Sequence, residues 1–98
     1  MGKNMIFDLI RELEMLLSDI TFSGINNIDY NTIEKAEALA DKFERISMHN
    51  IKSLLIELTY SIKKYKTEED KKTNIKEVSN NIAKIEFYIR NALSYEQT

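Results

Sequence analysis

Apolar residues recur along most of the chain at intervals of three or four positions, the spacing that places side chains on one face of an α-helix. The first such stretch covers residues 4–22 and ends near Gly24, because glycine readily adopts the left-handed conformation that closes many helices. We therefore predict a first helix over residues 4–22. Its buried face comprises Ile6, Leu9, Ile10, Leu13, Leu16, Leu17 and Ile20.

The segment 25–31 is rich in Asn and Asp, whose side chains bond the local backbone and compete with helix formation. This composition predicts a loop. Asn31 followed by Glu34 resembles a capping box and predicts a second helix that begins at Thr32. The loop residues expected to cover the end of the core are Ile25, Ile28 and Tyr30. The buried stripe of the second helix is Ile33, Ala36, Leu39, Ala40, Phe43 and Ile46.

Residues 47–50 are compatible with two backbones. A helix that continued from residue 32 to residue 66 would keep its apolar phase, but its length of about 35 residues far exceeds the average of about 11–12. In the alternative, Ser47 follows the helix cap, Met48 folds back onto the last turn, and Asn50 helps to cap the next helix. We favour the turn.

Two further apolar stripes predict two more helices. Thr67 followed by Glu68, Glu69 and Asp70 places a hydroxyl cap ahead of three acids, which favours a helix over about 68–95. The third helix presents Ile51, Leu54, Leu55, Leu58, Ile62 and Tyr65, and the fourth presents Ile75, Val78, Ile82, Ile85, Ile89 and Ala92.

Short connections force neighbouring helices to run antiparallel, so residues 1–98 are expected to form one all-α domain, an up-down-up-down four-helix bundle. The alternative is a three-helix bundle in which the second and third helices are continuous. The general build is similar to that of compact four-helix immunity and antitoxin-type proteins of bacteria, although no shared motif supports the likeness.

The composition argues against several classes of function. The chain has no cysteine, which excludes disulfides and cysteine-ligated zinc and is compatible with a reducing cytoplasm. No apolar stretch has the length of a membrane span, so we expect a cytoplasmic protein without membrane contact. A single histidine and the lack of a glycine-rich phosphate loop argue against a catalytic triad, a metal site or a nucleotide site. We expect neither catalysis nor a cofactor.

The run His49-Asn50-Ile51-Lys52-Ser53 resembles the phosphorylatable motif of histidine phosphotransfer domains, which are also helical bundles. In that motif a lysine follows the histidine at plus three. The resemblance implies that His49 accepts a phosphoryl group from a partner and that Lys52 offsets its charge. The same histidine also fits a turn or an early helical position without chemistry, and we favour this interpretation.

The lysines between Lys63 and Lys76 suggest a further alternative, contact with a nucleic acid. Acidic residues at positions 68–70 interrupt the cluster, and a pI near 5.4 argues against nonspecific binding of nucleic acids. We therefore expect a solvated surface of mixed charge. The lysines concerned are Lys63, Lys64, Lys66, Lys71, Lys72 and Lys76.

Four apolar or aromatic residues fall outside the predicted core stripes. Ile56 and Tyr60 lie four positions apart in the third helix, while Phe87 and Tyr88 flank the stripe of the fourth. Side chains four residues apart form a ridge on a helix, and aromatic ridges are typical of association surfaces. The sequence therefore predicts a non-catalytic, adaptor-type protein that binds another protein or a second copy of itself through these residues.

Overall fold

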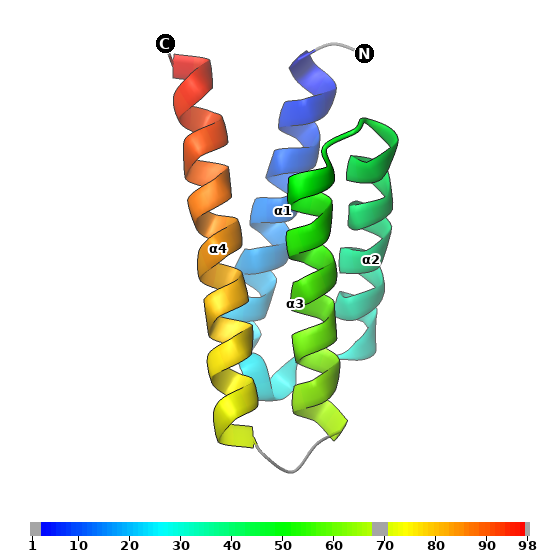
Figure 1. The fold of residues 1–98 in the computed structure, drawn as a ribbon, viewed down its shortest axis with the longest axis vertical. Helices are drawn as coiled ribbons and strands as arrows, with labels where there is room; N and C mark the ends of the chain where they lie inside the picture. The colour runs from blue at the N-terminus through cyan, green and yellow to red at the C-terminus, as the bar shows by residue number, and fades with distance from the viewer. Residues whose placement is uncertain (1–2, 68–70, 98) are drawn as a thin grey trace.

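The computed structural model describes residues 3–67 and 71–97, with side chains described for residues 5–67 and 71–92. The described residues form four α-helices and one short 3₁₀ helix, and consecutive α-helices run in opposite directions (Figure 1). This arrangement confirms the predicted antiparallel four-helix bundle. The helices are α1 (Lys3–Ser23), α2 (Tyr30–Arg45), α3 (His49–Thr67) and α4 (Lys71–Gln97), and the 3₁₀ helix is η1 (Ile25–Asn27).

One apolar core is shared by all four helices, and each helix contributes at least one side chain without exposed surface: Leu13, Phe43, Leu58 and Ile85. Burial of a side chain of this size stabilises the fold by about 1.5–3 kcal/mol. Helix α3 packs extensively against both α2 and α4, whereas α1 and α4 touch over a shorter stretch. The α4 stripe differs from the prediction at Ile75, which is exposed, because the neighbouring Asn74 is buried in its place.

A tight turn separates α2 from α3, so the continuous helix is excluded. Ser47 adopts a positive φ of 62°. The N–H of Ser47 donates to the carbonyl of Glu44 (3.0 Å), and the N–H of Met48 donates to that of Phe43 (2.9 Å). These are the two hydrogen bonds of the Schellman motif, in which a left-handed residue ends a helix. The predicted roles of Ser47 and Met48 are confirmed, although the left-handed residue is not glycine.

Replacing Ser47 with glycine is expected to raise the free energy of unfolding by about 0.5–1 kcal/mol, because glycine adopts a positive φ without a Cβ penalty. Urea unfolding at pH 7 measures the change. Ser53→Gly is the matched control, since Ser53 is an exposed residue within α3, where the change from serine to glycine should cost about 0.5 kcal/mol of helix propensity. Destabilisation by both substitutions would contradict the assigned backbone at Ser47.

The start of α2 corrects two predictions. The N-cap is Asp29 rather than Asn31, and its carboxylate accepts a hydrogen bond from the N–H of Thr32 (3.1 Å). Asp29 has the extended backbone of a cap, whereas Asn31 is already helical. Because the helix begins earlier, Tyr30 is its first residue and is 58% exposed instead of covering the core. Ile28 is buried, as predicted.

The start of α3 corrects a further cap prediction, whereas the cap predicted at Thr67 depends on residues 68–70, which lie outside the described residues. Helix α3 begins at His49, so Asn50 is its second residue and not a cap. Thr67 is the last residue of α3, where its hydroxyl donates to the carbonyl of Lys63 (3.0 Å). The acidic first turn predicted over residues 68–70 lies outside the described residues.

Candidate functional site

Ile56 and Tyr60 lie one turn apart on the side of α3 that faces away from the core. Their side chains are 43% and 65% exposed, whereas Leu55 and Leu58 beside them are fully buried. Residues at this spacing are neighbours on a helix surface. They form one apolar protrusion, called here the Ile56–Tyr60 ridge. The sequence pattern predicted this exposure because both residues fall outside the α3 stripe.

A groove of about 380 Å³ runs between α3 and α4 beside the ridge, and Tyr60 forms part of its wall. The walls carry carboxylate, amide, hydroxyl and ammonium groups, so the groove offers hydrogen-bonding and charged groups beside the apolar ridge. The ridge and the groove are adjacent and form one continuous surface, apolar at the ridge and lined with hydrogen-bonding groups in the groove. The residues that line the groove are Glu57, Tyr60, Ser61, Glu77, Asn80, Asn81 and Lys84.

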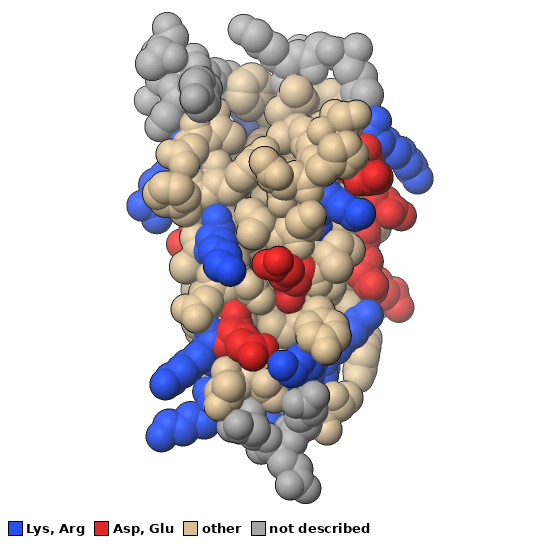
Figure 2. Space-filling model, viewed as in Figure 1, with Lys and Arg blue, Asp and Glu red and all other residues tan. Residues whose placement is uncertain are grey.

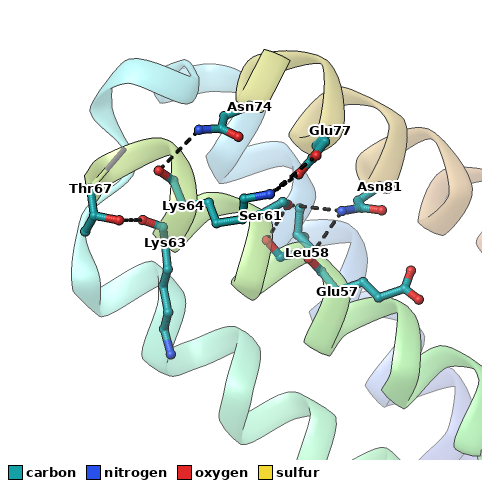
Figure 3. Close-up of polar contacts among 9 residues, drawn as sticks. All are labelled: Glu57, Leu58, Ser61, Lys63, Lys64, Thr67, Asn74, Glu77 and Asn81. Atoms are coloured by element: carbon teal, nitrogen blue, oxygen red, sulfur yellow. Dashed lines mark hydrogen bonds and ion pairs between the residues drawn. The ribbon is translucent and has the colours of Figure 1, made fainter. Parts of the chain in front are cut away.

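Two asparagines of α4, of which Asn81 lines the groove, form hydrogen bonds to α3 (Figure 3). The amide nitrogen of Asn81 donates to the carbonyl of Glu57 (3.2 Å) and to the hydroxyl of Ser61 (3.1 Å), and that of Asn74 donates to the carbonyl of Lys64 (3.4 Å). The two asparagines are seven residues apart, and so are the two carbonyls. These bonds fix the register of α3 against α4, because a shifted helix would leave the amides without acceptors.

Sequence reasoning missed this role. A signal was present, since two asparagines seven residues apart interrupt an apolar stripe that itself has nearly heptad spacing. Assigning every asparagine to the surface hides that signal.

The lysines of the Lys63–Lys76 region mostly contact their own chain. Lys63 pairs with Glu37 (3.4 Å) and Lys64 pairs with Glu77 (3.2 Å). The ammonium of Lys66 lies 5.2 Å from the centre of the Tyr30 ring, and Lys71 donates to the carbonyl of Tyr65. Both signs of charge are interspersed on this face of the molecule (Figure 2). These contacts do not form the continuous basic stripe that would favour the binding of nucleic acids.

Phe87 and Tyr88 take different positions in the structure. Phe87 is 65% exposed and lies on the side of α4 opposite the buried Val78. Tyr88 is half-buried against the core, and burial raises the pKa of its hydroxyl. Tyr88 lines a hollow of about 330 Å³ at the α2–α3 turn together with Ser47, Met48, His49 and Asn50. Tyr88 is therefore a neighbour of His49 in space.

The side chain of His49 forms a hydrogen bond with Glu44, near the C-terminal end of α2. Its side chain is 63% exposed, and its Nδ1 lies 2.9 Å from the Glu44 carboxylate. The same carboxylate oxygen lies 3.7 Å from the ammonium of Lys52. The hydrogen bond from His49, and then the charge of Lys52, hold the pKa of Glu44 below its usual value. Because a carboxylate only accepts hydrogen bonds, Nδ1 carries the proton, which leaves Nε2 as the acceptor nitrogen of the neutral ring.

The structure thus brings His49 and Lys52 together on one carboxylate, that of Glu44. This geometry does not test phosphoryl transfer, which stays a prediction from the motif. The direct effect of the cluster is structural, since Glu44 belongs to α2 while His49 and Lys52 belong to α3.

Phe22 is a further exposed aromatic side chain, and sequence reasoning did not single it out. It is 95% exposed near the end of α1 and borders a groove of about 490 Å³ between α1 and α4. The sequence contains the signal, because Phe22 lies nine residues after Leu13 and so falls on the opposite side of the helix from the buried stripe.

Other kinds of site are absent from the described part of the chain. Its acidic residues and its histidine form no group of three that would hold a metal ion. None of its helices combines the length and apolar character needed to cross a bilayer. The chain matches no protein-family model, and no match was found among curated proteins or among solved structures. The Ile56–Tyr60 ridge and its groove are therefore identified by geometry alone.

Proposed function

We propose that the protein is a non-catalytic interaction module that binds a protein partner through the Ile56–Tyr60 ridge. The observation that carries this proposal is the exposure of an isoleucine and a tyrosine, one turn apart, in the middle of a helix whose other face is fully packed. Single exposed apolar residues are common on protein surfaces. An exposed pair beside a groove that can receive partner side chains is typical of interfaces.

The position of the ridge also favours binding. Helix α3 packs against both α2 and α4, so its backbone is held rigidly before any partner arrives. Docking on a rigid element avoids the entropy cost of ordering a loop. Tyrosine is enriched among the residues that contribute most to binding, because its ring buries a large area and loses few rotamers. The polar groove beside Tyr60 supplies the hydrogen-bonding rim that such an anchor needs.

Replacing Tyr60 with glutamate is expected to weaken partner binding by at least about tenfold, because a carboxylate would have to be desolvated at the centre of the interface. The measurement has two parts. Sedimentation equilibrium compares self-association of the wild-type and variant chains, and capture on immobilised chains compares the proteins each retains from a cell extract. A circular dichroism spectrum verifies that the helix content is unchanged.

Tyr30→Glu is the matched control, because Tyr30 is 58% exposed and lies at the start of α2 instead of on the ridge. Binding should be unaffected by this change. Equal binding by the wild-type and Tyr60→Glu chains would refute the proposed function, as would a wild-type chain that remains monomeric and retains no protein.

A further inference from the structure

We infer that the partner that fits this surface is a second copy of the same chain, related by a two-fold axis parallel to the helices and running along the α3–α4 groove. The inference rests on the proposed function and identifies the partner that would occupy the ridge and the groove. It is carried by the charges on the two walls of the groove, which are complementary to each other when one copy is rotated onto the other.

Each wall of the groove presents one charged side chain that forms no ion pair within the described part of the chain. Glu57 lies on the α3 wall and Lys84 on the α4 wall. Neither residue takes part in an ion pair with any described residue. Figure 3 shows the carboxylate of Glu57 extending away from the contacts that surround its backbone. Both groups are therefore available to a partner.

The two charges also lie at nearly the same height along the bundle. The amide of Asn81 bonds the carbonyl of Glu57, so these two residues face each other across the groove. Lys84 is three residues further along α4, a displacement of about 4.5 Å at 1.5 Å per residue. Long glutamate and lysine side chains span that difference easily.

A two-fold axis along the groove exchanges its walls but keeps the height of every residue. Glu57 of one copy then meets Lys84 of the other, and the same pair forms a second time by symmetry. Tyr60 on the α3 wall is carried over the α4 wall of the second copy, where Asn80 offers an amide. A partner of one uniform charge would instead meet a like charge on one of the two walls, which is unfavourable.

Exchanging these charges tests the inference. Glu57→Lys and Lys84→Glu are each expected to raise the dimer dissociation constant by about tenfold, because each converts two attractive pairs into two repulsive ones. An equimolar mixture of the two variants should recover the wild-type dissociation constant, since each mixed dimer contains two attractive pairs again. Sedimentation equilibrium gives the constants, and native mass spectrometry identifies the mixed dimer by its mass.

Glu86→Lys is the matched control, because Glu86 is an exposed acid of α4 that lines the α1–α4 groove instead. It should leave the dissociation constant unchanged. If both single variants dimerise as wild type does, or if their mixture fails to recover, the inferred pairing is wrong. A wild-type chain that stays monomeric at about 1 mM also overturns the inferred dimer. If such a monomeric chain still captures a different protein, and the capture depends on Tyr60, the proposed function is retained while the inferred dimer is not.

Discussion

Replacing Phe43 with alanine is expected to lower the free energy of unfolding by about 3–5 kcal/mol. Phe43 has no exposed surface and lies in the last turn of α2, where its carbonyl also accepts the hydrogen bond that closes the α2–α3 turn. Removing its ring leaves a cavity that the surrounding helices fill only partly. For a chain of 98 residues this loss is a large share of a total stability of about 5–15 kcal/mol.

Phe87→Ala provides a control of the same chemistry, because Phe87 is 65% exposed on α4. Its effect on stability should stay within about 0.5 kcal/mol. Urea unfolding followed by circular dichroism measures both variants under the same conditions. Similar losses for Phe43→Ala and Phe87→Ala would show that the core does not lie where the structure places it.

The second large effect is expected for Asn81→Asp, which keeps the shape of the side chain but replaces a donor with an acceptor. The new carboxylate would face the carbonyl of Glu57 and the hydroxyl of Ser61, both bonded by the amide of Asn81. At pH 7 the substitution should cost about 2–3 kcal/mol, because a charged acceptor is placed against a carbonyl oxygen in a partly buried site. Urea unfolding again gives the value.

The pH dependence of this loss has a definite sign. The facing carbonyl raises the pKa of the new carboxyl above its unfolded value of about 3.9. The penalty is therefore complete above the raised pKa and shrinks as the pH falls toward about 4, where the protonated group donates in place of the amide. Asn80→Asp is the control, since Asn80 is an exposed groove residue. Equal losses at the two positions would rule out the assigned contacts of Asn81.

The four helices could be predicted because each has an apolar stripe of helical period. The stripes of α2 and α3 match the observed core, whereas Ile6 of α1 and Ile75 of α4 were predicted to be buried and are exposed. The α2–α3 turn was harder, since its left-handed residue is Ser47 and the usual glycine is missing. The turn was favoured over a continuous helix because a helix of about 35 residues would be unusually long. Met48 supplied the second signal, because the apolar residue after a left-handed cap commonly folds back onto the helix.

The helix caps could not be assigned with the same success. Asp29 and Asn31 are both good N-cap residues two positions apart, and they are distinguished in the structure by the extended backbone of Asp29 and by its hydrogen bond from Thr32. Thr67 posed the same difficulty, because a threonine hydroxyl bonds a preceding carbonyl at the end of a helix as readily as it caps the next one. The local sequence does not show which candidate residue caps a helix, because that choice depends on how neighbouring helices pack.

The candidate site was partly predictable for a similar reason. Exposure of Ile56 and Tyr60 follows from helical phase alone, so the ridge could be found in the sequence. The groove depends on which residues of α4 lie opposite α3, and the buried Asn74 sets that register. A hydrophobic pattern treats asparagine as a surface residue and places Ile75 in the core instead.

The register of α3 against α4 also limits how this protein can change length during evolution. The amides of Asn74 and Asn81 meet α3 at positions seven residues apart. One further step of seven along both helices leads to Asn50 and Tyr88, which line the hollow at the α2–α3 turn. A single inserted residue in either helix would rotate everything beyond it by about 100° and separate these partners. Lengthening would be tolerated only as two whole helical turns added to both helices together.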